Sequence, residues 1–246
     1  MQWFDKINTA FKRELDKEAP LYNCIIPEQL TCPEFELLRK YNVPWEATEK
    51  IDGECTSIHL IPVPMASENG GYVYTHRVEV HGKTDKANMR PEEVELLSNL
   101  GQKQALLDTF TDADGNPPTS EIIIFGETYG KGMQAPGGRY CKTHLKFICF
   151  DIKIGNTWLT RESVEDICKR LGIDTVPYLG EMTLDEAIER VKAGFTSQVS
   201  EDPTLPAEGI VLRAPLGILD RRGRRIITKV KTCDFRKLEE KLSCQK

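Results

Sequence analysis

Five stretches of the sequence share one design, in which an apolar strand presents charged or aromatic groups near its end. These stretches are Lys50 to Gly53, Phe125 to Glu127, Phe150 with Asp151, Glu208 to Val211, and Lys229 to Lys231. Because side chains alternate along a strand, Lys50 and Asp52 point the same way if Ile51 faces the core. Gly53 then permits a close backbone approach or a positive φ. Because several strands end in polar groups, the sequence predicts a fold built on β-sheets, with a catalytic or binding site at the ends of the strands.

The hydrophobic periodicity predicts both strands and helices. Strands are expected over residues 57–63, 72–80, 121–127, 145–152, 207–213 and 226–231. Helices are expected over residues 1–18, from a capping box at Thr31 to Tyr41, over 91–110 with a break at Gly101, over 160–172, over 183–194 and from Asp234. The first two strands form a long hairpin with a turn at Glu68 to Gly71, and Pro62 and Pro64 place the end of its first strand at a sheet edge.

Composition limits the class of protein. The chain has 246 residues, a formal net charge of -5, 39% hydrophobic and 29% charged residues. This balance can bury a core, and it excludes a uniformly basic coat for nucleic acid but not a local basic patch. No stretch resembles a membrane span or a signal peptide, so we expect a cytoplasmic protein, in host cytoplasm if it is phage-encoded. The eight cysteines include no Cys-x-x-Cys pair, and we expect reduced thiols and no zinc site.

Taken together, the five stretches supply an amine, several carboxylates, further cations and an aromatic ring. This set suits a phosphoanhydride and a purine, with carboxylates that hold a divalent metal and lysines that neutralise phosphate. Any one stretch alone is most often a solvated strand end.

The same stretches resemble motifs I, III, IIIa, IV and V of the covalent nucleotidyltransferases, the superfamily of ATP-dependent polynucleotide ligases and mRNA-capping guanylyltransferases. Their order and spacing match across residues 45–232. Residues 125–134 followed by 147–152, and Thr48-Glu49-Lys50, are most similar to the phage T4-type RNA ligase 2 family. The resemblance implies an α+β fold of antiparallel sheets flanked by helices, with the nucleotide in the groove between them. We expect one nucleotidyltransferase domain over residues 1–246, with residues 1–44 as its helical N-terminal part.

The resemblance also implies the catalytic groups. Lys50 would attack the α-phosphate of ATP and form a lysyl-AMP phosphoramidate. Lys229 and Lys231, which share a strand face, are similar to the family's phosphate-binding pair, and together with bound metal they would favour the free amine of Lys50. Asp52 would orient Lys50 or an outer-shell water of the metal.

Other residues are expected to bind the nucleotide and the metal. Glu127 resembles the carboxylate that hydrogen-bonds the ribose, and Glu208 the one that binds Mg²⁺ or Mn²⁺, with Asp52 as a further metal group. Phe150 resembles the aromatic that stacks on adenine, and Phe147 is the less favoured alternative because it falls on the other strand face. The remaining nucleotide contacts would come from Glu49, which helps to read adenine, and from Arg77, on the ribose or phosphate.

Two departures from the family pattern stand out. Members of the RNA ligase 2 family often carry a histidine where Asp52 stands and an asparagine where Cys55 stands. Residues 232–246 are too few for an OB-fold, so we expect a bare nucleotidyltransferase domain with no further C-terminal domain, for which full end joining needs a partner protein or domain or works best on pre-adenylated ends.

The expected function is ATP-dependent RNA ligation, which joins a 3′-hydroxyl to a 5′-phosphate as in RNA repair. The substrate could be a nicked duplex, single strands or an RNA/DNA hybrid. A DNA ligase, a capping guanylyltransferase and a non-catalytic nucleic-acid-binding derivative are the alternatives. The cluster Arg221 to Arg225 fits either a grip on a nucleic-acid backbone or a solvated hairpin tip.

Overall fold

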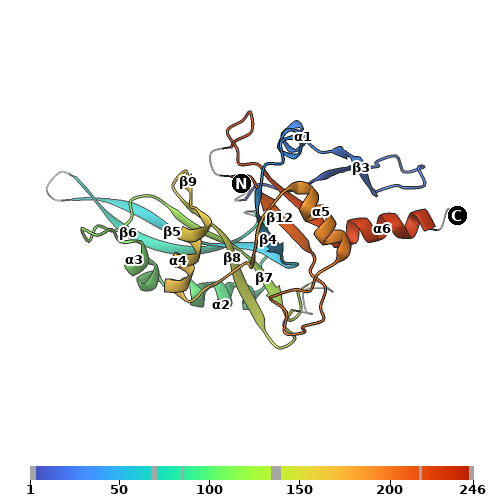
Figure 1. The fold of residues 1–246 in the computed structure, drawn as a ribbon. Helices are drawn as coiled ribbons and strands as arrows, with labels where there is room; N and C mark the ends of the chain where they lie inside the picture. The colour runs from blue at the N-terminus through green and yellow to red at the C-terminus, as the bar shows by residue number, and fades with distance from the viewer. Residues whose placement is uncertain (1–3, 68–70, 85, 134–139, 216–217, 244–246) are drawn as a thin grey trace. The chain divides into compact units, whose positions relative to one another are not determined.

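The computed structural model describes residues 4–67, 71–84, 86–133, 140–215 and 218–243 (Figure 1). The chain folds into two compact units. Unit 1 consists of Met1–Asp5 and Asp52–Val176, and unit 2 of Lys6–Ile51 and Pro177–Lys246. The chain therefore passes from unit 2 to unit 1 directly after the Lys50-Ile51 pair. The expectation of one domain over residues 1–246 stays a prediction.

Unit 2 is built on a sheet in which β4 lies between β12 and β11. The strand order is β1-β13-β12-β4-β11. The bounds are β1 Asn8–Thr9, β4 Trp45–Lys50, β11 Tyr178–Met182, β12 Gly209–Arg213 and β13 Ile227–Lys231. All pairs are antiparallel except β1 with β13. A second, two-stranded sheet pairs β2 (Phe11–Arg13) with β3 (Ile25–Leu30).

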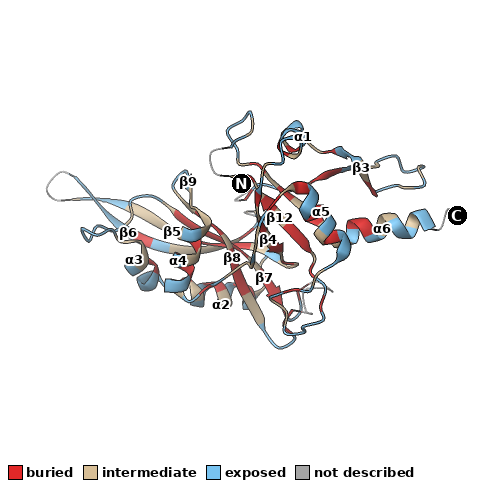
Figure 2. Cartoon of the chain, in the orientation of Figure 1, coloured by how far each residue is buried: buried red, intermediate tan, exposed pale blue. Residues whose placement is uncertain are grey.

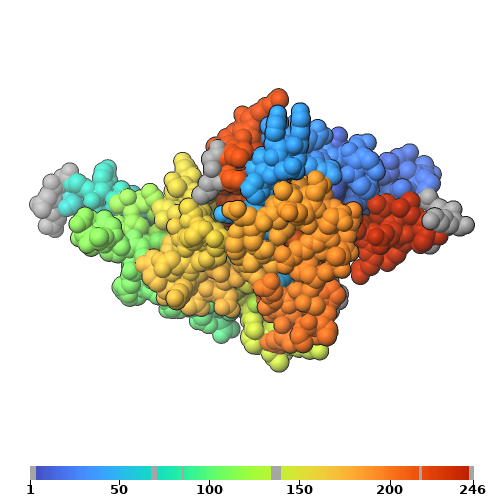
Figure 3. Space-filling model, in the orientation of Figure 1, coloured from blue at the N-terminus to red at the C-terminus, as the bar shows by residue number. Residues whose placement is uncertain are grey.

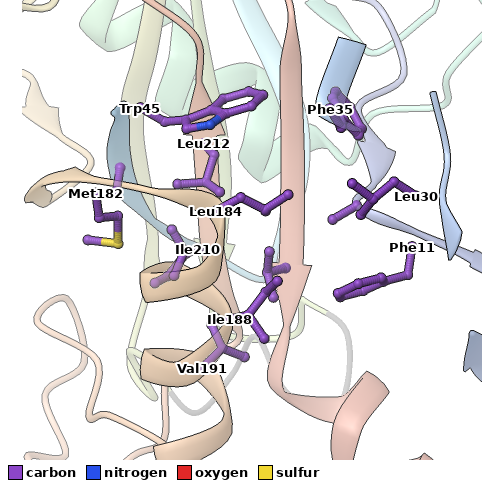
Figure 4. Close-up of a cluster of buried hydrophobic side chains, with 14 of the residues drawn as sticks. Phe11, Leu30, Phe35, Trp45, Met182, Leu184, Ile188, Val191, Ile210 and Leu212 are labelled. Atoms are coloured by element: carbon purple, nitrogen blue, oxygen red, sulfur yellow. The ribbon is translucent and has the colours of Figure 1, made fainter. Parts of the chain in front are cut away.

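One face of the unit 2 sheet packs against helices. These helices are α1 (Pro33–Lys40), α5 (Leu184–Ala193) and α6 (Thr232–Ser243). Leu184, Ile188 and Val191 of α5 pack with Ile210 and Leu212 of β12 in one buried cluster (Figure 4). The α5 and α6 helices contact each other and lie on the visible surface of this unit, in orange and red (Figure 3). Helices thereby cover this face of the sheet, and the opposite face carries Lys50, Lys229 and Lys231.

Unit 1 is built on a six-stranded antiparallel sheet with a short parallel edge. The order is β10-β8-β7-β5-β6, and β9 pairs with β8. The bounds are β5 Glu54–Ala66, β6 Tyr72–Gly82, β7 Ile122–Gly130, β8 Leu145–Ile154, β9 Thr157–Trp158 and β10 Asp174–Thr175. The helices α2 (Pro91–Leu100), α3 (Lys103–Phe110) and α4 (Arg161–Leu171) contribute Leu97, Leu106 and Ile167 to its core.

Buried residues follow the central strands of unit 1, whereas the outer part of the β5–β6 hairpin is largely exposed (Figure 2). Ile58 and Leu60 of β5 and Ile122 and Ile124 of β7 face the helices. Beyond Leu60, β5 pairs with β6 alone, which confirms the edge predicted from its prolines.

Most elements predicted from periodicity are confirmed. The structure contains the expected hairpin (β5 and β6), the helix break at Gly101, the central strands β7 and β8, and the later strands β12 and β13. The α6 helix begins at Thr232 rather than at the expected Asp234. Thr160 caps α4, and Thr183 with Glu186 closes the capping box of α5. The hairpin turn predicted over 68–71 lies mostly outside the described residues. The seven described cysteines are free thiols. Among the described helices, none is long and apolar enough to cross a membrane.

Two predictions near the N-terminus are wrong. Within the described residues, the segment expected to form a helix over 1–18 contains β1 and β2 instead. These strands form because β1 pairs with β13 and β2 pairs with β3. Residues 8–30 therefore do not form a helical N-terminal part. The capping box expected at Thr31 does not form either, since α1 begins after Cys32 with no side-chain cap, and the Thr31 hydroxyl donates to the carbonyls of Thr9 and Ala10 instead.

Candidate active site

The polar face of the unit 2 sheet gathers three lysines. Along β4, Trp45 and Ala47 enter the core, so alternation turns Lys50 to the opposite face. Val230 is likewise buried between Lys229 and Lys231, which confirms that these two lysines share a face. The register Lys50↔Gly209↔Lys231 sets two of the lysines in one row across three strands.

Glu208 joins these lysines. Its Oε2 lies 2.6 Å from the Nζ of Lys50, and its Oε1 lies 2.7 Å from the Nζ of Lys231. Its backbone carbonyl accepts a hydrogen bond from the Thr232 N–H (2.9 Å), which fixes the residue directly before β12. Burial lowers the pKa of Lys231, but the hydrogen bond and charge of Glu208 outweigh it and raise that pKa above the ordinary value. One carboxylate thus pairs with two ammonium groups.

Gly209 makes this row possible. A Cβ at this position would lie 2.1 Å from the carbonyl oxygen of Val230, so a larger residue would force β12 away from β13. Glycine also leaves no side chain between Lys50 and Lys231, and both reach the carboxylate of the preceding residue.

The structure does not bring Glu49 to Lys50. As its sequence neighbour on a strand, Glu49 points to the other face, where it is 1% exposed. The Ser197 hydroxyl and the Gln198 N–H both donate to its carboxylate. Burial raises the pKa of Glu49, and these two hydrogen bonds partly offset the rise. Its carboxylate anchors the loop that follows α5.

In unit 1, the face of the sheet opposite the helices carries Glu127. Cys55 lies opposite Glu127 in the β5–β7 register. Burial, followed by the negative charge of Glu127, raises the pKa of the Cys55 thiol to about 12, and Lys83 opposes this effect. The Gly53 N–H donates to Glu127 Oε1 (3.2 Å), and a Cβ on Gly53 would lie 2.2 Å from the Thr128 carbonyl oxygen. Of the two reasons predicted for this glycine, close approach is therefore confirmed.

A β-bulge presents Phe150 on the same face. Phe125 pairs with Asp151 and Gly126 with Cys149, so Phe150 is an extra residue in β8. A bulge of this kind shifts the alternation by one and redirects a side chain. Phe147 is buried in the core with the helices, whereas Phe150 is half-buried and contacts the ring of Phe4.

Arg77 lies on this face but not near Glu127. It pairs with Ile61, which is roughly 20 Å along β5 from Cys55 at about 3.3 Å per residue. Its guanidinium forms an ion pair with Glu79 (3.0 Å). The cation that acts on Cys55 beside Glu127 is Lys83, which the sequence analysis did not predict. One pair beyond Thr56↔Gly82, the hairpin register would set Lys83 opposite Cys55, so this register could have indicated it.

Two further candidates complete the set. Asp52 is the first residue of the main segment of unit 1, and its N–H donates to the Tyr140 hydroxyl (3.2 Å). In the basic turn, Asp220 accepts from the backbone and guanidinium of Arg224 and from the Arg222 N–H, which hold its pKa at about 2. The exposed Arg221 and Arg222 thus sit on an ordered turn.

Glu208 is the group that fits a divalent cation. Within the parts of the chain that the structure describes, no cluster of three or more His, Cys, Asp or Glu could hold a metal alone. Mg²⁺ commonly binds through one or two carboxylates together with substrate phosphates and waters, so a single carboxylate beside lysines is a suitable donor set.

Comparison with solved structures defines the fold. A Naegleria gruberi RNA ligase variant solved with ATP and Mn matches 98% of this chain and 65% of its own, with a TM-score of 0.58 and 16% identity. A second variant with ATP and Mn matches at TM-score 0.56 and 17% identity over 97% of this chain and 63% of its own. The chain thus spans less than two thirds of these proteins. It has the α+β nucleotidyltransferase-type fold of antiparallel sheets and helices.

The family follows from the sequence model. The RNA ligase family model matches residues 43–231, and the chain belongs to this family. The comparison with curated proteins gives no match. Assignment to the T4-type RNA ligase 2 subfamily stays a prediction.

Proposed function

We propose that this protein is an ATP-dependent RNA ligase that joins 3′-hydroxyl and 5′-phosphate RNA ends through lysyl-AMP. The observation that carries the proposal is the Lys50–Glu208–Lys231 cluster on the polar face of the unit 2 sheet. A nucleophilic amine, a carboxylate and phosphate-binding cations are what nucleotidyl transfer to lysine requires.

In the first step, the Lys50 Nζ attacks the α-phosphorus of ATP. A P–N bond forms, the bond to pyrophosphate breaks, and pyrophosphate leaves. Lys231 and Lys229 stabilise the charge that develops on the α-phosphate oxygens. The Lys50 amine must be free to reach the phosphorus, whereas in the structure its Nζ is held 2.6 Å from Glu208 Oε2. Glu208 must therefore release Lys50 before attack.

Mg²⁺ or Mn²⁺ held by Glu208 would supply positive charge for the phosphates. A cation bound at Glu208 would compete with Lys50 and Lys231 for the same two carboxylate oxygens. This competition would weaken the contact between Glu208 and Lys50 and leave the Lys50 amine free to face the nucleotide. Asp52 is proposed to orient the nucleophile or a metal-bound water.

In unit 1, we assign Glu127 to the ribose hydroxyls and Phe150 to the adenine face. Two steps then complete the reaction. A 5′-phosphate oxygen attacks the AMP phosphorus, the P–N bond breaks and Lys50 is restored. The 3′-hydroxyl next attacks the adenylylated 5′-phosphate, and AMP leaves as the phosphodiester forms.

The test is sealing of labelled RNA, as single strands and as nicked duplexes, with matched DNA substrates. Wild-type protein with ATP and Mg²⁺ is expected to seal RNA. Lys50→Ala should lose sealing with ATP but keep it with pre-adenylated RNA, because the first step is then bypassed. Lys192→Ala, which removes an exposed lysine paired with Glu189 on α5, is the control and should behave as wild type.

Sealing of DNA alone would contradict the assignment to RNA. Failure of the wild-type protein on pre-adenylated RNA would show that these residues do not perform end joining.

A further inference from the structure

Four aromatic rings form a cluster on the Glu127 face of unit 1. Phe4 lies at its centre, with ring centroids 5.1 Å from Phe150, 5.2 Å from Phe125 and 5.7 Å from Trp158. The interplanar angles of Phe4 with Phe150 and Trp158 are 72° and 84°, the edge-on geometry that aromatic pairs favour. Phe4 is only 7% exposed, so it is a packed member of the cluster.

The Phe150 ring contacts Phe4, which itself packs against two further rings of the cluster. Phe150 is the extra residue of a β-bulge, because Phe125 of β7 pairs with Asp151 and Gly126 with Cys149. Phe125 is buried, and its own ring packs against Trp158 at 5.5 Å. Trp158 is in turn covered by the Lys153 ammonium, 5.5 Å from its ring centroid. The Phe4 ring contacts both Phe125 and Trp158 and also contacts Phe150, so it links the Phe150 ring to this packed pair.

We propose that Phe4 is a positioning residue for the nucleobase, which holds the Phe150 ring in the orientation that stacks on adenine. An edge-on neighbour leaves at least one face of Phe150 free of Phe4, and Phe150 is only half-buried. A base can stack on a ring only if that ring is held in place, because ordering a loose side chain opposes binding. The inference rests on the proposed function, in which Phe150 contacts adenine.

The test measures ATP binding separately from chemistry. Calorimetric titration with ATP and Mg²⁺ is performed on the full chain carrying Lys50→Ala, with and without Phe4→Ala. Loss of the Phe4 ring is expected to raise the Kd for ATP about five- to tenfold, the upper range for lost aromatic contacts. Phe4→Leu should restore part of the affinity. In the Lys50-containing protein, Phe4→Ala should raise the KM for ATP in self-adenylylation and leave the maximal rate within about twofold.

Two controls separate positioning from general destabilisation. Phe11→Ala removes a buried ring that packs edge-on against Phe235 in unit 2, and it should lower thermal stability without changing the Kd. In a Phe150→Ala background, Phe4→Ala should have no further effect on the Kd, because its action passes through Phe150.

An unchanged Kd, or tighter binding in Phe4→Ala, would overturn the inference, and tighter binding would mean that Phe4 obstructs the base. If ATP binding follows the expected pattern but no adenylylation occurs, the proposed function fails and the inference stands. If ATP does not bind the parent protein, both fail.

Discussion

Replacement of Glu208 by glutamine tests the central ion cluster directly. The substitution keeps the shape of the side chain but removes the negative charge between Lys50 and Lys231, whose nitrogens lie 2.6 and 2.7 Å from its oxygens. The three side chains are 13–27% exposed, so solvent still reaches them in part. Hydrogen bonds to charged groups contribute about 1.5–3 kcal/mol, and solvent reduces this contribution. We therefore expect a net loss of about 2 kcal/mol.

For a chain of 246 residues, that loss corresponds to a fall in Tm of roughly 4–8 °C, measured by circular dichroism at neutral pH. The matched control is Asp185→Asn, which breaks a pair with Arg39 at 2.7 Å in the same unit. Its side chains are 51% and 39% exposed, and its loss should stay below about 1 kcal/mol. A double-mutant cycle of Glu208→Gln with Lys231→Met should show coupling of at least about 1 kcal/mol. An unchanged Tm in Glu208→Gln, or zero coupling, would refute this reasoning.

Three further predictions concern buried groups. Burial is the main cause that lowers the pKa of His59 below its ordinary 6.5, so the stability contributed by its neutral ring is present above about pH 6.5 and lost as the pH falls through the lowered pKa. Urea unfolding should therefore show a smaller stability loss between pH 7.5 and pH 5 in His59→Gln than in wild type, and equal losses would contradict this cause. The Cys55 thiol, with a pKa of about 12, should resist iodoacetamide at pH 8 in native protein and react after denaturation, as read by mass spectrometry; rapid native labelling would disprove its burial beside Glu127. Gly209→Ala would place a Cβ 2.1 Å from the Val230 carbonyl oxygen, so it should cost more than about 2 kcal/mol in thermal unfolding and weaken self-adenylylation, whereas a wild-type Tm would show that the strands separate easily.

Alternation along strands was the part of the fold and site most readily predicted from the sequence. It placed Lys229 and Lys231 on one face and Lys50 on the polar face of its sheet, as the buried Val230 and Ala47 confirm. The same rule places Glu49 away from Lys50, because adjacent strand residues point oppositely. The adenine-reading role expected for Glu49 came from the resemblance rather than from this geometry.

The features that could not be predicted from the sequence depend on pairing between segments that lie far apart along the chain. The first residues show helical spacing, yet Asn8 and Thr9 pair with Thr228 and Lys229, some 220 positions later. No local pattern reports such a pairing. The bulge at Phe150 is set by the β7–β8 register, and the place of Arg77 by the β5–β6 register. Both registers are tertiary properties.

The measurement that tests the central claim most directly is covalent label transfer. Wild-type protein, Lys50→Ala and Lys50→Arg are incubated with Mg²⁺ and either α-labelled ATP or α-labelled GTP, then separated under denaturing conditions, and the labelled peptide is mapped. The account predicts label from ATP, on Lys50, in the wild-type protein only. Label from GTP alone, label that persists in Lys50→Ala, or no label in folded wild-type protein would contradict it.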